Sequence, residues 1–158
     1  MVVGKEQFME TAVELAIESV LTRNGGPFGC VIVKNGEIIG RGKNSVTTKN
    51  DPTAHAEIMA IRDACENLST FQLDECDVYT SCEPCPMCLG AIYWARPKAV
   101  YYASTKTDAA AIHFDDQFIY EEIDLVKEKR SIPFVQLTPK GYEEPFKMWE
   151  KINDKVEY

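Results

Sequence analysis

Two short segments of the sequence combine residues that can hold a metal ion with a residue that can move protons beside it. The first segment contains His55 and Glu57, and the second contains Cys85 and Cys88. One imidazole and two thiolates would give Zn²⁺ three protein ligands, which leaves the fourth tetrahedral position for water, as in catalytic zinc sites. Bound zinc lowers the pKa of that water to about 7, so hydroxide becomes available near neutral pH. The two segments therefore predict a hydrolytic zinc site with one Zn²⁺ per subunit.

The spacing of these residues sets conditions on the helices that carry them. Cys85 and Cys88 lie three positions apart at the predicted start of a helix, so both sulfurs share one face of its first turn. The free N–H groups and the positive dipole end of that turn favour thiolates. Another helix is predicted to begin near Thr53, and two positions along a regular helix differ in direction by about 200°. His55 must therefore lie at or before the irregular first turn if Glu57 is to serve as the proton shuttle beside the metal.

A structural zinc site is the alternative that the same residues leave open. Cys82 forms a second C-x-x-C pair with Cys85, so Cys82 could supply a fourth ligand and exclude the water. That arrangement would leave Glu57 without a role. His113 is the one other histidine, and a single polar residue in a predicted loop indicates a structural or exposed position.

The motif residues lie within longer segments that also resemble a known family. H-x-E followed by P-C-x-x-C is the signature of the zinc nucleobase deaminases, and both halves are present. Around them, the segments 25–29, 50–57, 79–95 and 114–116, and the terminal Glu157-Tyr158, resemble bacterial guanine deaminases of the cytidine deaminase fold. The resemblance implies a three-layer α/β/α fold and hydrolysis of guanine to xanthine and ammonia, with hydroxide attacking C2. It also implies a homodimer whose C-terminal segments are exchanged between subunits.

The resemblance also assigns a substrate pocket. It implies that Asn44 binds the purine, that Phe28 stacks on it and that Asp116 reads its polar edge. It further implies that Ala54 contacts the substrate and that the C-terminal Tyr158 closes the pocket. These residue types suit the ligand, because a carboxylate accepts from the N–H donors of guanine, an amide meets mixed donor and acceptor edges, and aromatic faces bind flat bases.

The rest of the sequence predicts an α/β layered domain with helices on both faces of a mixed sheet of about five strands. Asn35-Gly36 between two strand-like runs is typical of a two-residue hairpin turn. Strand-like and helical patterns alternate after this hairpin, which favours layers of both kinds. The predicted strands are 28–33, 37–42, 78–80, 99–103 and 133–137, and the predicted helices are 7–21, 53–68, 85–95, 119–126 and 143–154.

Length and composition limit the remaining possibilities. A chain of 158 residues fits a single domain over 1–158. The formal net charge of −8 disfavours nucleic acid as a partner, because phosphate binding depends on clustered Lys and Arg. Six cysteines, three of them at intervals of three residues, fit metal binding in a reducing compartment better than a disulfide framework. Because the sequence has no apolar run of about 18 residues and no secretion signal, we expect a cytoplasmic protein with no membrane partner.

Three rival functions share these features. Guanosine deamination needs the same zinc ligands with a pocket mouth that admits ribose, and a terminal aromatic lid favours the free base instead. Adenosine deamination in tRNA uses the same signature, and the acidic composition disfavours it. A zinc-stabilised binding module without activity is the third. We therefore expect a small-molecule purine substrate, most simply guanine.

Overall fold

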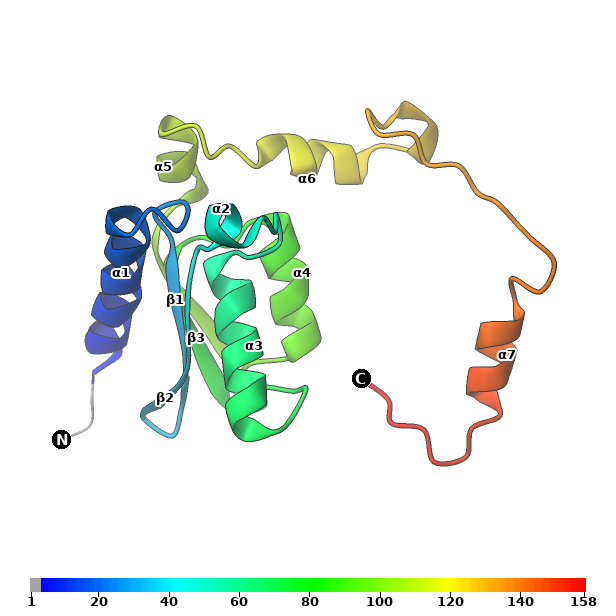
Figure 1. The fold of residues 1–158 in the computed structure, drawn as a ribbon, viewed down its shortest axis with the longest axis horizontal. Coiled ribbons are helices and arrows are strands. Elements are labelled where there is room, and N and C mark those ends of the chain that lie inside the picture. The colour runs from blue at the N-terminus through cyan, green and yellow to red at the C-terminus, as the bar shows by residue number, and fades with distance from the viewer. Residues whose placement is uncertain (1–3) are drawn as a thin grey trace. The chain divides into compact units, whose positions relative to one another are not determined.

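The computed structural model describes residues 4–158, which divide into two compact units. The first unit extends to Gln117 and contains the whole sheet, and the second runs from Phe118 to Tyr158. In the first unit the elements follow in the order α1 (Lys5–Leu21), β1 (Gly29–Lys34), β2 (Glu37–Lys43), α2 (Val46–Lys49), α3 (Ala56–Leu68), β3 (Cys76–Cys82), α4 (Pro86–Ala95), β4 (Ala99–Ser104) and α5 (Lys106–Ala111) (Figure 1).

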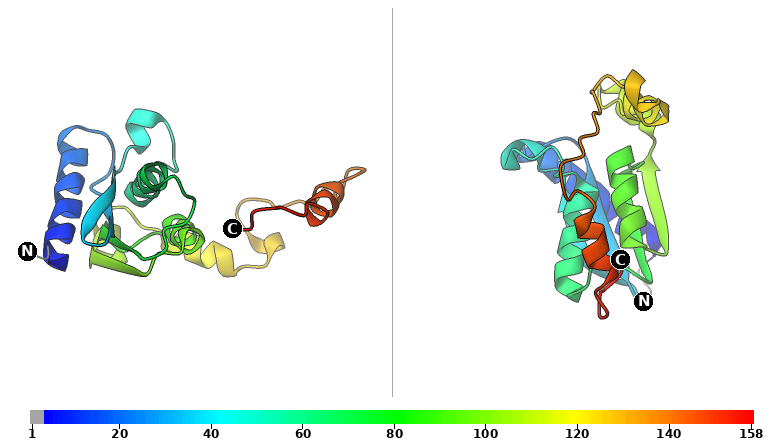
Figure 2. Two further views of the ribbon diagram at one scale, coloured as in Figure 1. Left: turned by 90° about the horizontal axis from the view of Figure 1, so that it is seen from below. Right: turned by 90° about the vertical axis from the view of Figure 1, so that its right-hand side faces the viewer.

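A mixed sheet of four strands forms the middle layer of the first unit. The strand order is β2-β1-β3-β4, with β1 antiparallel to both of its neighbours and β3 parallel to β4. Asn35 and Gly36 join β1 to β2 with φ angles of +52° and +82°, which suit a type I′ turn and confirm the predicted hairpin. α1 covers one face of the sheet, and α3 and α4 lie on the other (Figures 1 and 2). The predicted three-layer architecture is therefore confirmed.

Alternate residues of β1 supply the two halves of the hydrophobic core. Val31 and Val33 pack with Phe8 of α1, whereas Cys30 and Ile32 pack with α3 on the opposite face. This alternation follows from the two-residue period of a strand, and both faces of β1 are covered. Complete burial of one Val or Ile side chain contributes about 1.5–3 kcal/mol to stability. The core thus fixes which face of the sheet each helix occupies.

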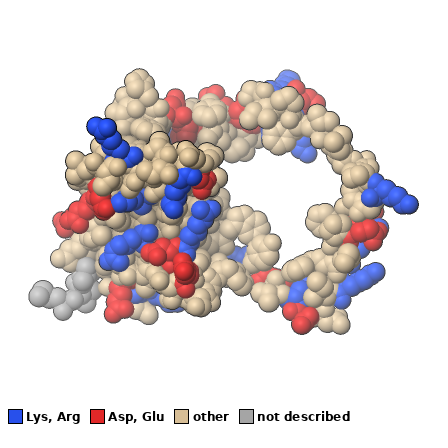
Figure 3. All heavy atoms as spheres, in the orientation of Figure 1, with Lys and Arg blue, Asp and Glu red and all other residues tan. Residues whose placement is uncertain are grey.

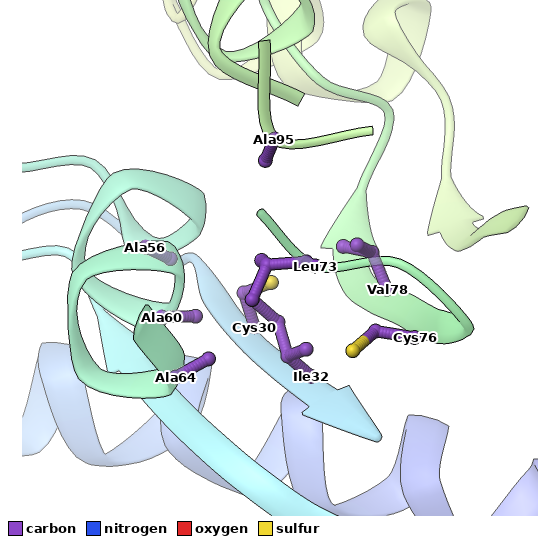
Figure 4. Packing of buried hydrophobic residues seen from close by; sticks show 9 residues of the cluster. All are labelled: Cys30, Ile32, Ala56, Ala60, Ala64, Leu73, Cys76, Val78 and Ala95. Atoms are coloured by element: carbon purple, nitrogen blue, oxygen red, sulfur yellow. The ribbon is translucent and has the colours of Figure 1, made fainter. Parts of the chain in front are cut away.

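Small residues let α3 approach the sheet closely. Ala56, Ala60 and Ala64 are fully buried and point from α3 toward β1 (Figure 4). On β2, a Cβ atom at Gly42 would overlap the carbonyl oxygen of Ala56, so only glycine allows this approach. The N-terminal end of α3 is therefore held firmly against the sheet.

The second unit contains two helices and no strand among its described residues. Its elements are α6 (Gln117–Asp124), the 3₁₀ helix η1 (Lys127–Lys129) and α7 (Glu144–Glu150). The predicted fifth strand over 133–137 is wrong, because this segment is irregular and residues 118–158 offer no strand with which its backbone groups could pair. No residue of 118–158 is buried, so this unit has no hydrophobic core of its own.

Several predicted boundaries also differ from the structure. α3 begins at Ala56 rather than near Thr53, and α7 covers Glu144–Glu150 rather than 143–154. α2 and α5 were not predicted, since helices of four and six residues are too short to show a hydrophobic period. Among residues 4–158, no helix has the length and apolar character needed to cross a membrane.

Candidate active site

The three predicted zinc ligands lie at the start of two helices on the same face of the sheet. His55 is the N-cap residue of α3 and Cys85 is the N-cap residue of α4, and both have extended backbone conformations. Cys88 follows in the first turn of α4. In a regular helix, side chains two positions apart differ in direction by about 200°. Because His55 precedes the regular helix, this rotation does not apply to the pair His55 and Glu57. The condition that the sequence set for a shared site is therefore met.

The distances within this triad of His55, Cys85 and Cys88 fit a zinc ion. Nδ1 of His55 lies 3.5 Å from each of the two Sγ atoms, and the three ligand atoms lie within 4.8 Å of one another. Tetrahedral zinc with nitrogen at about 2.05 Å and sulfur at about 2.3 Å would place these atoms about 3.6 Å apart. The described part of the chain contains no other group of three or more His, Cys, Asp or Glu side chains with this geometry. The triad is therefore the candidate zinc site of the described chain.

Hydrogen bonds within the triad favour a thiolate at Cys85. The hydrogen bond from Cys88 is the largest influence on the pKa of Cys85, which falls to about 4 although burial opposes the change, and His55 lowers it further. The same interaction with Cys85, followed by burial, raises the pKa of Cys88. The hydrogen bond to Cys85 also raises the pKa of His55. The triad therefore presents a thiolate, which is the form of cysteine that binds metal.

Glu57 is a buried carboxylate next to the triad. It lies in the first turn of α3 and is 6% exposed, and Oγ1 of Thr80 donates a hydrogen bond to its Oε1 at 3.0 Å. Burial is the largest influence on the pKa of Glu57 and raises it, while hydrogen bonds from its own backbone, Cys88 and Thr80 oppose the shift. A raised pKa suits a group that must both accept and donate protons near neutral pH.

Cys82 makes a contact away from the triad. It is the last residue of β3, and its Sγ donates a hydrogen bond to the carbonyl oxygen of Thr105 at 3.5 Å. Burial raises the pKa of Cys82 to about 11, and the charge of Glu57 adds to this effect. A protonated thiol with its own acceptor favours the open site with three ligands over the structural site in which Cys82 would be the fourth.

Asn44 is held in a buried loop directly after β2. Its backbone N–H donates to the carbonyl oxygen of Phe28 at 3.0 Å, and its own carbonyl accepts from Ser19 Oγ at 2.9 Å. Its side-chain Oδ1 accepts a hydrogen bond from the backbone N–H of Val46 at 3.2 Å. A Cβ atom at Gly25 would overlap this Asn44 side chain, so glycine is needed for the amide to sit here. The loop therefore fixes both the backbone and the amide of Asn44.

Three further residues of the predicted pocket also lie in the first unit. Ala54 is fully buried immediately before the first zinc ligand. Phe28 and Phe114 pack edge to face, with ring centroids 5.1 Å apart and an interplanar angle of 89°. Asp116 is partly buried, and burial first and the negative charge of Cys85 second raise its pKa, which places its carboxyl within electrostatic reach of the triad.

The remaining two residues that the sequence singled out lie elsewhere. Tyr158 belongs to the second unit, so its predicted role in closing the pocket stays a prediction. His113 is exposed with a φ of +73°, and its backbone N–H donates to the carbonyl oxygen of Ala110. The sequence indicated a structural or exposed position for His113, and the structure places it at an exposed one.

Two residues of the site were not predicted. Phe114 lies in a segment that carries the resemblance, but nothing in the sequence paired it with Phe28. Thr80 also lies in such a segment, 79–95, but it was assigned no role beyond its place in a strand. The alternation of β3 would have placed Thr80 on the same face as Val78, toward α3, and this was the available signal.

Comparisons with known proteins agree with this geometry. Residues 3–104 match the family model for the cytidine and deoxycytidylate deaminase zinc-binding region, and this range includes the triad and Glu57. The chain is 61% identical to guanine deaminase of Bacillus subtilis (strain 168) over 153 residues, which cover 97% of this chain and 98% of that protein. The X-ray structure of guanine deaminase from Bacillus subtilis matches with a TM-score of 0.96 at 60% identity, covering 99% of both chains.

A second group of relatives shares a smaller part of the chain. The tRNA-specific adenosine deaminase of Aquifex aeolicus is 42% identical over 101 residues, which cover 64% of this chain and 66% of that protein. The family model covers the part of the chain that contains His55, Cys85 and Cys88. This chain therefore belongs to the cytidine and deoxycytidylate deaminase family of zinc-binding proteins.

Proposed function

We propose that this protein is a zinc-dependent guanine deaminase, which converts guanine and water to xanthine and ammonia. The observation that carries the proposal is the triad with three close ligand atoms and a buried Glu57 beside it. Similarity to the Bacillus subtilis guanine deaminase over nearly the whole of both chains supports guanine as the substrate. The similarity to a tRNA-specific adenosine deaminase covers only 64% of this chain.

The residues of the site account for each proton that the reaction moves. The triad would hold the zinc, which when bound acidifies water and so supplies hydroxide near neutral pH. Glu57 takes the first water proton as the oxygen adds to C2 of guanine, and it passes this proton to the ring nitrogen N3. Glu57 then takes the proton of the new hydroxyl group and delivers it to the departing amino group. The C2–N bond breaks, ammonia leaves, xanthine keeps the oxygen, and Glu57 is again a carboxylate.

The predicted pocket residues suit the binding of a purine. The Asp116 carboxylate would accept from N–H donors on the polar edge of guanine, and the Asn44 amide would meet an edge of mixed donors and acceptors. The face of Phe28 would stack on the base, with Phe114 packed against its ring. Ala54 directly precedes His55 and is fully buried, so its predicted contact with the substrate stays a prediction. Tyr158 would close the pocket.

The distribution of charge supports a small-molecule substrate over a nucleic acid. On the face shown in Figure 3, the Lys and Arg side chains of the first unit alternate with Asp and Glu rather than forming a continuous basic surface. The formal net charge of the chain is −8. Binding to the phosphates of tRNA would draw its free energy from clustered positive charge. Guanine carries no phosphate, so its binding does not require clustered positive charge.

Ammonia release from zinc-loaded protein tests the proposed function. With guanine, guanosine and adenosine supplied at equal concentrations, we expect release from guanine to be fastest, because a pocket closed by an aromatic residue has no room for ribose. The measurement is a coupled ammonia assay, with xanthine identified by its absorbance. Faster release from guanosine would assign a nucleoside as the substrate. Absence of release from all three, with zinc bound, would overturn the proposal in favour of a binding module.

We also propose that the protein is a homodimer in which C-terminal segments are exchanged. The second unit has no buried residue, and it exposes large apolar side chains such as Phe146 at 77% and Val135 at 76%. The first unit has an apolar groove of about 450 Å³ between α1 and α5, and Ile17 and Ile112 in it are half exposed. Apolar surfaces of this kind favour burial against another chain.

The mass in solution tests the proposed dimer. Light scattering of the full chain at micromolar concentration is expected to give twice the 17.8 kDa of one chain, because both units present uncovered apolar surface. A single mass of 17.8 kDa would contradict the homodimer and with it the exchange of segments.

A further inference from the structure

We propose that Thr80 is a positioning residue that holds the Glu57 carboxylate in the orientation needed for proton transfer. This inference rests on the proposed function, in which Glu57 moves every proton. It assigns a part in the reaction to a residue that none of the motifs contains. Thr80 itself does not touch the substrate or the zinc ligands in the proposed reaction.

The hydroxyl group of Thr80 lies between two acceptors. Oγ1 is 3.0 Å from Oε1 of Glu57 and 3.1 Å from the carbonyl oxygen of Cys82. Only one proton is available on the hydroxyl, and a carboxylate accepts a stronger hydrogen bond than a neutral carbonyl does. The Thr80 hydroxyl is therefore expected to donate to Oε1 of the Glu57 carboxylate and to fix its orientation.

The sheet fixes the position of this hydroxyl. Thr80 is 1% exposed and lies in β3, a central strand, where it pairs with Cys30 of β1 and Tyr102 of β4. Val78, two residues earlier, belongs to the core cluster under α3, so Thr80 faces the same helix. Its side chain is also β-branched, which restricts rotation about χ1. Thr80 is thus a rigid donor on a rigid strand.

A rigid donor matters because the Glu57 side chain is flexible, and its other hydrogen-bond partners are its own backbone and Cys88. The side chain of a glutamate has three rotatable bonds, and a proton acceptor must stay within hydrogen-bond distance of the atom that it serves. Glu57 is buried, and a buried carboxylate without a partner would be costly. If Thr80 had only a structural role, its hydrogen bond to the Cys82 carbonyl would be sufficient. Its hydrogen bond to Glu57 indicates a further role.

Paired substitutions separate the hydroxyl of Thr80 from its packing. Thr80→Val keeps the shape and removes the donor, whereas Thr80→Ser keeps the donor and removes a methyl group. We expect Thr80→Val to lower kcat by about tenfold to hundredfold, the effect of losing one hydrogen bond to a charged group, with little change in KM. Thr80→Ser is expected to retain most of the wild-type kcat. Thr80→Ala serves as a second variant without the donor, in case valine impairs folding.

Ser81→Ala is the matched control for loss of a buried hydroxyl. Ser81 is the next residue in β3, and its Oγ accepts from the backbone N–H of Gly29 at 3.0 Å instead of donating to Glu57. We expect this variant to lower the melting temperature without the selective loss of kcat. The proposal is overturned if either variant without the donor keeps the wild-type kcat, or if Thr80→Ser loses as much kcat as Thr80→Val.

A structural readout keeps this test independent of the substrate. Crystal structures of the zinc-loaded wild-type, Thr80→Ser and Thr80→Val proteins, without substrate, would show the rotamer of Glu57. We expect the contact of 3.0 Å to persist in the first two and the carboxylate to rotate in the third. An unmoved carboxylate in Thr80→Val would overturn the inference. If guanine turns out not to be the substrate, the rotamer of Glu57 still decides this inference separately.

Discussion

Replacing Glu57 with Gln is expected to leave zinc bound and to lower kcat by roughly 10²- to 10⁴-fold, the usual contribution of a general acid and base. The amide has nearly the same shape as the carboxylate, but it cannot take a proton from water or return one to N3 and the leaving amine. Zinc content should not change, because Glu57 is not one of the three ligand atoms of the triad. The measurement is ammonia release from guanine together with zinc analysis of the same sample.

The melting temperature and a matched substitution complete this test. Glu57 is 6% exposed, and a neutral amide costs less to bury than a carboxylate, so we expect Glu57→Gln not to lower the melting temperature. Glu66→Gln is the control, because Glu66 is an exposed residue of the same helix and loses the same charge. Normal ammonia release from Glu57→Gln would show that another group moves the protons.

Replacing Cys88 with Ala should remove both zinc and activity, whereas replacing Cys82 with Ala should remove neither. Loss of a residue that only supports a metal ligand typically weakens metal binding by roughly 10- to 100-fold. Cys88 supplies one of only three ligand atoms in the triad, so its loss should weaken zinc binding by more than that. Cys82 is buried to a similar extent, but its thiol is bonded to the carbonyl of Thr105. Zinc per chain and ammonia release are measured for both variants.

The comparison of the two cysteines distinguishes a catalytic site from a structural one. A site with three protein ligands keeps one position for water, and a site with four protein ligands does not. If Cys82→Ala lost its zinc as fully as Cys88→Ala, Cys82 would be a fourth ligand and hydrolysis at this centre would be excluded. The melting temperature of each variant without added zinc serves as a control for simple damage to the core.

The features that could be predicted from the sequence are those that depend on neighbours in the chain. The turn at Asn35-Gly36 and the helix α1 follow from local preferences, and both are present. The placement of His55 before the regular helix followed from the need to face Glu57. The segment 133–137 has the composition of a strand, but a strand also needs a partner for its backbone groups, and composition does not supply one.

The contacts that could not be predicted join residues far apart in the sequence. Thr80 and Glu57 are brought together by the packing of α3 on the sheet, and no local pattern encodes the depth at which a helix lies on a sheet. The edge-to-face pair of Phe28 and Phe114 likewise depends on how the loops that carry them converge. Such contacts between distant residues depend on the tertiary structure, whereas the residues within the H-x-E motif and within the C-x-x-C motif are close in the sequence and can be recognised there.

The proposed metal ligands and the residues proposed to contact the base are supported by different elements. His55 and Cys85 cap the N-termini of two helices that lie on the sheet, and Cys88 lies in the first turn of α4, whereas Phe28, Asn44 and Asp116 lie in connections that cap neither helix. Substitutions, insertions or deletions in those connections would reshape the proposed pocket for another amino-substituted ring and leave the helix N-termini that carry the triad in place. Proteins that share this architecture can therefore differ in substrate specificity while they keep the same hydrolytic reaction.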